Sequence, residues 1–226
     1  MIRFDRASKR YPNGREALSG ATFEIREGEM VFLTGCSGAG KSTVLKLIAL
    51  LERPTRGLVM VNGCNTSALS SRRIPAFRRQ LGVVFQDHRL LTERSIFDNV
   101  ALPLHAAHAP LKEIDKRVRA ALDQVGLLDR AKSLPLELSV GEQQRVGIAR
   151  AVVVKPKLLI ADEPTGNLDP GLSMEVMGLF RRFNEVGVTV VIATHDIELV
   201  KASGLREIIV ADGKVQDPAT EKLVVP

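Results

Sequence analysis

One glycine-rich loop constrains the fold of this chain more than any other feature of its sequence. Gly35–Ser42 reads G-x-x-x-x-G-K-S, follows the apolar run Met30–Thr34 and opens the helical segment Lys41–Leu51. A loop of this spacing between a strand and a helix is typical of phosphate-binding sites, because the backbone N–H groups of the loop and of the helix start converge on an anion. The sequence therefore predicts an α/β fold built around a nucleotide site.

Apolar strands and helical segments alternate along most of the chain. Strands are expected at Ile2–Phe4, Thr22–Ile25, Met30–Thr34, Leu58–Asn62, Leu158–Asp162, Val188–Ala193 and Glu207–Ala211. Helices are expected at Leu111–Val125, at Glu142–Val153 and over the segment that carries Leu172, Val176, Phe180 and Phe183 on one face. Pro103 and Pro110 are expected to bracket a loop before the first of these helices. This alternation favours a parallel sheet covered on both faces.

The length of 226 residues suits one domain with a sizeable core. Residues 1–86 and 155–226 are expected to form that core, including an N-terminal β part. Residues 87–154 change to helical spacing and are expected to form a helical subdomain that projects from the core.

The composition indicates a globular protein made and kept in the cytoplasm. Apolar residues make up 45% of the chain and charged residues 26%. No apolar run reaches the roughly 18–20 residues needed to cross a bilayer, and the first residues alternate like a strand rather than a secretory signal. Cys36 and Cys64 give neither a disulfide framework nor a metal-binding spacing.

The formal net charge of +6 admits several partners. The densest basic cluster, Arg72–Arg79, carries one aromatic residue and no base-stacking pattern, so we expect a solvated basic surface and no nucleic-acid partner. Proximity to the inner surface of the membrane is the functional alternative.

The residue types in the loop suit a triphosphate. Gly35, Gly38 and Gly40 let backbone N–H groups approach the phosphates without a Cβ in the way. Lys41 is expected to reach the β- and γ-phosphate oxygens, and the Ser42 hydroxyl to ligate Mg²⁺.

Polar residues at the ends of other strands are expected in the same crevice, since ligands bind at the carboxyl ends of strands in open α/β sheets. Asp162 would hold Mg²⁺ through water, and Glu163 would act as the general base on the attacking water. Gln86 could touch Mg²⁺ or that water, and His195 could reach the γ-phosphate. These residues make Glu163, His195 and Gln86 the catalytic candidates, and Ser42, Gln86 and Asp162 the metal candidates.

Ser139–Glu142 precedes a helix and forms a second possible anion site. The chain has a single phosphate loop, so this second site suits the γ-phosphate of an ATP bound by another copy. The alternative is an N-cap serine without a ligand.

Taken together, these motifs resemble those of the ATP-binding cassette ATPases over nearly the whole chain. The resemblance implies a phosphate-loop NTPase fold with a parallel-sheet core, an N-terminal antiparallel β part and a helical subdomain. It assigns Gly35–Thr43 to the Walker A loop, Gln86 to the Q-loop, Ser139–Gln143 to the signature, Leu158–Glu163 to Walker B, Asn167–Asp169 to the D-loop and His195 to the switch histidine. It also makes Tyr11 the aromatic that stacks on adenine, the alternative being a core aromatic.

The resemblance therefore implies a homodimer that forms on ATP binding. The residues expected to bind ATP are Tyr11, Gly35, Cys36, Ser37, Gly38, Ala39, Gly40, Lys41, Ser42, Thr43, Ser139, Gly141 and Glu142. One departure is Val140, where the family usually has glycine. A β-branched residue is costly there if the backbone needs a positive φ, which would weaken contact with the second copy's γ-phosphate.

Within the family, several stretches are most similar to the bacterial cell-division ATP-binding proteins of the FtsE type. They are Met1–Phe4, Gly28–Met30, Phe32–Gly35, Glu52–Pro54, Phe85–His88 and Phe183–Val190. The similarity implies a peripheral protein on the cytoplasmic face of the bacterial inner membrane that pairs with a polytopic, FtsX-like membrane protein. ATP cycling would then switch on peptidoglycan hydrolysis at the septum, with the cytoplasmic division ring protein as a further partner.

Alternative functions share the same chemistry. A lipoprotein-release or efflux ATPase would have a different membrane partner, and an ATP-binding scaffold of low turnover would be consistent with Val140. A soluble cassette that acts on DNA or ribosomes usually carries coiled-coil insertions or a second cassette, and neither is seen.

The membrane partner is expected to dock just after Gln86. The apolar residues offered there are Leu90, Leu91, Ile96, Phe97, Val100, Leu102 and Leu104, with Asp87, Arg89, Glu93 and Arg94 at the rim. About half of these apolar residues are expected to face inward.

Overall fold

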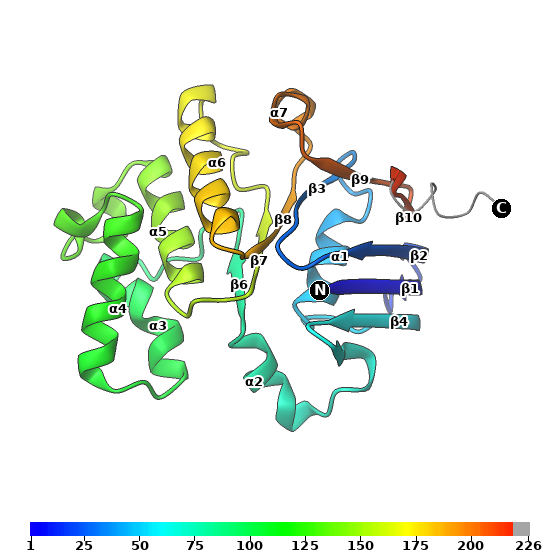
Figure 1. Cartoon of the computed structure of the whole chain (residues 1–226), viewed down its shortest axis with the longest axis horizontal. Coiled ribbons are helices and arrows are strands. Elements are labelled where there is room, and N and C mark those ends of the chain that lie inside the picture. The colour runs from blue at the N-terminus through cyan, green and yellow to red at the C-terminus, as the bar shows by residue number, and fades with distance from the viewer. Residues whose placement is uncertain (219–226) are drawn as a thin grey trace.

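The computed structural model describes residues 1–218 and has two lobes (Figure 1). One lobe holds the two sheets, and the other is made of helices α3, α4 and α5. The strands are β1 Ile2–Arg10, β2 Glu16–Ile25, β3 Met30–Thr34, β4 Arg56–Val61, β5 Cys64–Asn65, β6 Leu81–Val84, β7 Leu158–Asp162, β8 Thr189–Ala193, β9 Arg206–Ala211 and β10 Lys214–Gln216. The helices are α1 Lys41–Ile48, α2 Ile74–Arg78, α3 Ile96–Ala106, α4 Leu111–Gln124, α5 Val140–Val152, α6 Pro170–Glu185 and α7 Ile197–Ser203.

The N-terminal sheet has the strand order β2-β1-β4-β5, with every pair antiparallel. Alternate residues of β1 point to the core, so Ile2 and Phe4 are buried while Arg3 is exposed. Phe4 faces Phe23 of β2 in the register, and their rings stack with centroids 4.4 Å apart. The expected antiparallel β part is therefore confirmed.

The second sheet has the order β10-β9-β3-β8-β7-β6, and every pair is parallel except β10 with β9. Its inner strands are apolar and buried over nearly their whole length, as two-sided cover requires. Because β3, β6, β7 and β8 run parallel, the segments that follow them meet at one edge of the sheet.

The helical lobe differs from expectation at Pro103. Pro103 lies inside α3 and not at the start of a loop. Ser95 caps this helix by accepting a hydrogen bond from Asp98 N, and Ile96, Val100 and Leu104 form a fully buried stripe at helical spacing. The stabilisation from burying that stripe outweighs the cost of the one backbone hydrogen bond that proline cannot donate.

Two apolar clusters lie on opposite faces of the parallel sheet. One joins α1 with the N-terminal sheet. The other joins α3, α4, α5 and α6 with residues of the sheet such as Phe32 and Ile192. Helices of the segment 87–154 thus share their core with the sheet. The assignment of residues 87–154 to a separate subdomain remains a prediction.

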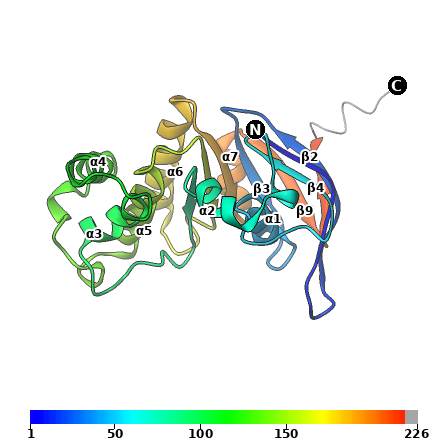
Figure 2. The ribbon, with the colours of Figure 1, turned by 90° about the horizontal axis from the view of Figure 1, so that it is seen from below.

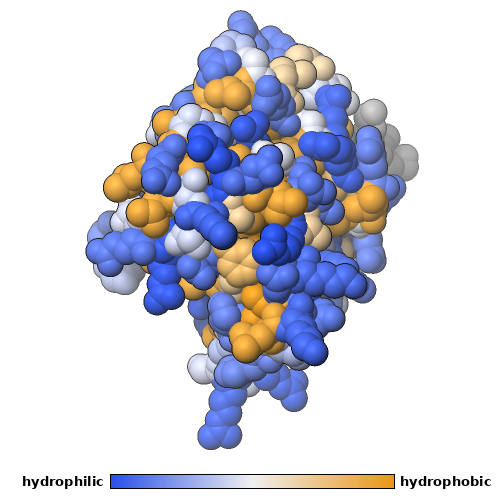
Figure 3. Space-filling model, turned by 90° about the vertical axis from the view of Figure 1, so that its left-hand side faces the viewer, coloured by the Kyte–Doolittle hydropathy of each residue, from blue (hydrophilic) through white to orange (hydrophobic). Residues whose placement is uncertain are grey.

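The outer side of the helical lobe is mostly hydrophilic, with apolar atoms in separate patches (Figure 3). Leu111 and Leu136 are among the exposed apolar residues of this lobe. No helix within residues 1–218 combines the length and the apolar character that a bilayer span requires.

Candidate nucleotide site

The phosphate loop Gly35–Gly40 connects β3 to the first residue of α1, as expected. Gly35, Gly38 and Gly40 have φ values of 140°, 78° and 121°, a region that favours glycine. A Cβ on Gly35 would lie 2.0 Å from the carbonyl oxygen of Val210, and one on Gly40 would lie 2.6 Å from that of Ala17. The neighbouring backbone therefore excludes any side chain at these two positions.

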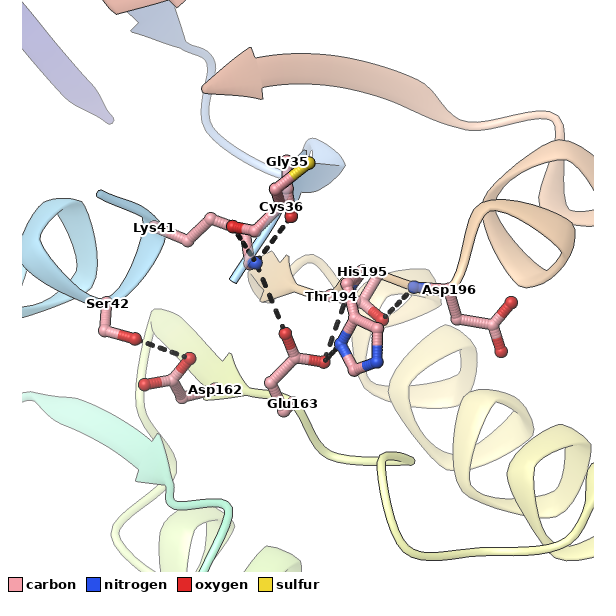
Figure 4. Close-up of polar contacts among 9 residues, drawn as sticks. All are labelled: Gly35, Cys36, Lys41, Ser42, Asp162, Glu163, Thr194, His195 and Asp196. Atoms are coloured by element: carbon pink, nitrogen blue, oxygen red, sulfur yellow. Dashed lines mark hydrogen bonds and ion pairs between the residues drawn. The ribbon is translucent and has the colours of Figure 1, made fainter. Parts of the chain in front are cut away.

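Lys41 directs its ammonium group back into the loop (Figure 4). Its Nζ donates hydrogen bonds to the carbonyl oxygens of Gly35 at 2.7 Å and Cys36 at 3.2 Å, and lies 3.5 Å from Glu163 Oε1. The Lys41 side chain is only 6% exposed, so this positive charge is fixed in a partly desolvated position.

Asp162 lies at the end of β7, opposite the start of α1. Ser42 Oγ donates a hydrogen bond to Asp162 Oδ1 at 3.2 Å (Figure 4). Burial raises the pKa of Asp162, and the nearby charge of Glu163 raises it further, while the hydrogen bond from Ser42 opposes the shift. A divalent cation at this position would favour the ionised carboxylate.

Ser42 and Asp162 together fit Mg²⁺, because both offer the oxygen ligands that this ion prefers. Within residues 1–218, no group of three or more His, Cys, Asp or Glu side chains could hold a metal ion. A two-oxygen set of this kind suits an ion that completes its shell with water and substrate phosphates, as Mg²⁺ usually does.

Glu163 lies between two basic side chains. Its Oε1 faces Lys41 Nζ, and its Oε2 lies 2.9 Å from His195 Nδ1 at the end of β8 (Figure 4). Glu163 has a φ of 48°, which is unusual for a residue with a side chain, and its N–H donates to Ala193 O at 2.9 Å. The backbone therefore holds a strained conformation that turns this carboxylate toward the phosphate loop.

The pocket beside the loop has a volume of about 560 Å³. It is lined by Tyr11, Arg15, Ala17, Ser37, Gly38, Gly40, Lys41, Ser42, Thr43, Lys46, Gln86, Glu163 and His195. Tyr11 lies at this pocket and not in the core, and its hydroxyl is 3.4 Å from Thr43 Oγ1. The pocket thus combines an aromatic side chain with the glycine-rich loop and several basic and hydroxyl side chains.

Sequence reasoning missed three of the lining residues. Arg15 donates from Nη2 to Gly38 O at 2.8 Å, so it braces the phosphate loop from the β1–β2 hairpin. Lys46 follows Ser42 by four residues on α1, and this helical spacing was the available signal. Ala17 and Arg15 come from a distant strand pair, and no local pattern indicates their position.

Four expected site residues do not line the pocket. Three of them belong to the phosphate loop, and the fourth contacts the start of α1. Gly35 and Cys36 bind Lys41 through their carbonyl oxygens, and Asp162 binds Ser42. Ala39 packs in the apolar cluster beside α1.

Ser139, Gly141 and Glu142 are not brought to this pocket. Ser139 caps α5: its Oγ accepts from Glu142 N at 3.3 Å, and Glu142 Oε2 accepts from Ser139 N at 2.8 Å. The hydrogen bond from the Ser139 backbone lowers the pKa of Glu142.

Val140 does not carry the strain expected from the sequence. It is the first residue of α5 and is absent from the positive-φ positions of residues 1–218. A β-branched side chain is acceptable in a right-handed helix, and Val140 is 48% exposed at the surface. The expected cost at this position is therefore wrong, since it required a left-handed backbone.

The loop after Gln86 is held by two side chains of the helical lobe. Arg150 donates to the carbonyl oxygens of His88 and Arg89, the latter at 2.6 Å, and both residues have left-handed φ values of 53° and 49°. Asn99 is fully buried and binds Leu91 N at 2.7 Å and Leu91 O at 3.0 Å. Burial lowers the pKa of His88, which favours a neutral imidazole in this loop.

A second hollow, apolar and about 310 Å³ in volume, lies between the lobes. It is lined by Ala49, Leu51, Arg78, Arg79, Leu81, Val83, Phe85, Pro103, Ala106, Arg150, Ala151 and Val154. We call it the interlobe groove. None of the apolar residues expected after Gln86 lines it. Ile96, Val100 and Leu104 are buried in the lobe core because they face away from the groove.

Comparison with known proteins agrees with this geometry. The family described as ABC transporter matches residues 18–166. The Cell division ATP-binding protein FtsE of Escherichia coli (strain K12) is 57% identical over 213 residues, which cover 94% of this chain and 96% of that protein.

Two solved structures share the fold at a TM-score of 0.87. One is the dimeric structure of MJ0796, described as a bacterial ABC transporter cassette. It is 37% identical, and the match covers 96% of this chain and 97% of that one. The other is a dimeric, post-hydrolysis state of the same ATP-binding cassette bound to ADP and Pi. It is 35% identical, with 96% and 98% covered.

Proposed function

Because the chain belongs to the ATP-binding cassette (ABC) transporter family, we propose that it hydrolyses ATP as a subunit of a membrane complex in bacterial cell division. One observation carries this proposal. The Glu163 carboxylate lies between Lys41 and His195 at the phosphate-loop pocket, held there by a strained backbone. A carboxylate in that position can accept a proton from a water molecule that attacks the terminal phosphate.

Each side chain then has a distinct part in hydrolysis. Lys41 and the loop N–H groups neutralise the β- and γ-phosphates, and Tyr11 stacks on the adenine. His195 orients Glu163 through the 2.9 Å contact and reaches the γ-phosphate. Ser42 and Asp162, with Gln86, would hold Mg²⁺, which supplies charge stabilisation to the phosphates when it is bound.

ATP is expected to join two copies of the chain. Ser139 is exposed at the start of α5, where the capping box pairs the N–H groups of Ser139 and Glu142 and leaves those of Val140 and Gly141 for an anion. Ser139, Gly141 and Glu142 do not reach the pocket of their own chain. The two MJ0796 structures are both dimeric. We assign these residues to the γ-phosphate bound by the partner copy, and the helical geometry of Val140 removes the argument for a scaffold of low turnover.

The interlobe groove is the proposed docking site of the membrane partner. It is apolar, it lies beside the loop that follows Gln86, and Arg150 belongs to both. A helix of a polytopic, FtsX-like protein would insert its apolar face there. This holds the chain at the cytoplasmic face of the inner membrane, where ATP cycling switches on peptidoglycan hydrolysis at the septum. The division ring protein is a further proposed partner.

The relatives favour this function over lipoprotein release or efflux. The E. coli protein at 57% identity is named for cell division, and proteins of that name from several other bacteria also match. The lipoprotein-release, efflux and division branches share the same chemistry. The names of these relatives therefore support the division branch.

Glu163→Gln tests the catalytic assignment. The amide keeps the size of the side chain but cannot accept the proton, so MgATP binding should persist. The hydrolysis rate of the purified chain should fall roughly 10²- to 10⁴-fold, the usual contribution of a general base. Glu113→Gln on the exposed face of α4 is the matched control and should hydrolyse ATP at the wild-type rate. Wild-type turnover by Glu163→Gln would contradict the assigned base.

A further inference from the structure

The positive charge of this chain is concentrated in one segment. Residues 53–86 contain six arginines and no Asp or Glu. The whole chain has 32 Lys and Arg against 26 Asp and Glu, so the remaining residues carry 26 of each and are neutral overall. The entire net charge of +6 therefore belongs to these 34 positions.

Four of the six arginines gather around α2. Arg72 and Arg73 lie in the short 3₁₀ turn Ser71–Arg73 that leads into α2, and Arg78 and Arg79 lie at its end. All four are exposed. We call them the α2 arginines.

The α2 arginines have no acidic neighbour to neutralise them. Within residues 1–218, no ion pair includes any of them. Arg78 donates one hydrogen bond, to the carbonyl oxygen of Leu50 at 2.7 Å, and Arg72 and Arg73 keep their guanidinium groups in solvent. Helix α4 makes the contrast clear, because its basic residues alternate with Glu113, Asp115 and Asp123.

The position of α2 relates this charge to the groove. Seen from below the view of Figure 1, α2 lies on the near face between the helical lobe and the N-terminal sheet (Figure 2). Arg78 and Arg79 form part of the wall of the interlobe groove. A membrane protein that docks in that groove brings the bilayer surface to this same side of the molecule.

We propose that the α2 arginines bind the phosphate groups of anionic phospholipids in the membrane beside the docked partner. The inference rests on the proposed function, since the groove defines which side faces the membrane. A guanidinium group matches a phosphate with two parallel N–H donors, and each basic residue near an anionic surface adds to membrane attraction.

The surface suits lipid better than nucleic acid. Single-stranded nucleic acid is bound by arginines combined with exposed aromatic rings, whereas Phe77, the aromatic residue of α2, is only 5% exposed. A bilayer surface needs only cationic groups on one face. The exposed positions of α2 that lie between the arginines, Pro75 and Ala76, are small and allow close approach to a flat surface.

Vesicle flotation with the purified full-length chain tests the proposal. Wild type should float with vesicles that contain phosphatidylglycerol and phosphatidylcholine, and should stay unbound with phosphatidylcholine alone. Binding should weaken as salt rises from 50 to about 300 mM, because exposed charges are screened over roughly 8 Å at physiological ionic strength.

The test variant is R72Q/R73Q, which leaves the groove wall unchanged. Its partition onto anionic vesicles should fall about fivefold for each arginine, on the order of 25-fold in all. R72K/R73K keeps the charge and should retain most of the binding. K112Q/K116Q on α4 removes the same charge from another exposed helix and should bind like wild type.

Equal vesicle binding by R72Q/R73Q and K112Q/K116Q would overturn the proposal, and so would wild type that ignores phosphatidylglycerol. If wild type binds a DNA duplex but no vesicles, and R72Q/R73Q loses the DNA binding, the α2 arginines form a nucleic-acid surface instead. ATP hydrolysis is measured in parallel and should be unchanged in every variant. Active ATPase without vesicle binding refutes this inference alone, whereas absent ATPase refutes the proposed function.

Discussion

Asn99 offers a test of how the helical lobe holds the loop after Gln86. Its side chain is fully buried and accepts from Leu91 N, while its Nδ2 donates to Leu91 O, Arg94 O and Ser95 O at 3.0 to 3.1 Å. Two amide hydrogens serve these three carbonyl oxygens, so about three independent hydrogen bonds are at stake. At about 1 kcal/mol each, Asn99→Ala should cost about 3 kcal/mol of unfolding free energy.

Urea unfolding measures this cost. With a slope of roughly 3 kcal/mol per molar urea, suited to a chain of this size, the midpoint should fall by about 1 M. Asn99→Asp should be worse at neutral pH, because a carboxylate would face the same three carbonyl oxygens. It should partly recover in acid, where a protonated carboxyl group can donate.

Asn13→Ala is the matched control. Asn13 is exposed and accepts one hydrogen bond, from Arg15 N at 3.1 Å, so its loss should change stability by about 0.5 kcal/mol or less. If Asn99→Ala unfolds within about 0.2 M urea of wild type, the loop is not held by this side chain and the reasoning fails.

Three further predictions follow from the site, the groove and the loop. Light scattering of Glu163→Gln with MgATP should show a dimer, and adding Ser139→Arg should leave a monomer; a dimer that ignores ATP would contradict shared sites. Leu51→Glu should abolish co-purification with the membrane partner, keep ATP binding and make cells filamentous, whereas normal division despite partner loss would contradict the division assignment. Burial lowers the pKa of His88 below its ordinary 6.5. The contribution of neutral His88 to folding stability is therefore fully present above pH 6.5 and is lost as the pH falls through the lower pKa of the folded state. The hydrogen-exchange protection factors of residues 86–95, which correct for the intrinsic pH dependence of exchange, should therefore fall on acidification and lose this dependence in His88→Gln. An unchanged protection factor in wild type would contradict the prediction.

Much of the fold follows from local pattern. Met30–Thr34 and Leu158–Asp162 are strands with the expected bounds, because continuous apolar runs bounded by polar residues leave little choice. Helix α3 was missed because Pro103 looks like a boundary, and only the buried stripe of the packed lobe explains it. The short β10 and α7 carry too few residues for a periodic signal.

The site residues also divide into those that a local motif predicts and those that it does not. Lys41, Ser42 and Glu163 belong to motifs whose spacing fixes them relative to a strand or helix end, so sequence alone predicts their meeting. Arg15 reaches the phosphate loop from a hairpin 20 residues upstream of Gly35, and nothing local marks it. Val140 shows the converse, since its expected cost depended on a positive φ, and the backbone there is the right-handed start of α5.

Helix α5 links two proposed binding sites of this chain, the interlobe groove and the Ser139 end. Its 13 residues form a rod of about 20 Å with Ser139 and Val140 at one end and Arg150 near the other. Arg150 lines the groove and donates to the carbonyl oxygens of His88 and Arg89. In the proposed function, α5 would therefore contact the membrane partner at one end and the second copy's nucleotide at the other. By thermodynamic reciprocity, any factor by which ATP alters partner affinity must equal the factor by which the partner alters ATP affinity. Binding of the partner in the groove would then change the affinity for the nucleotide shared across the dimer, with the single helix α5 connecting the two sites.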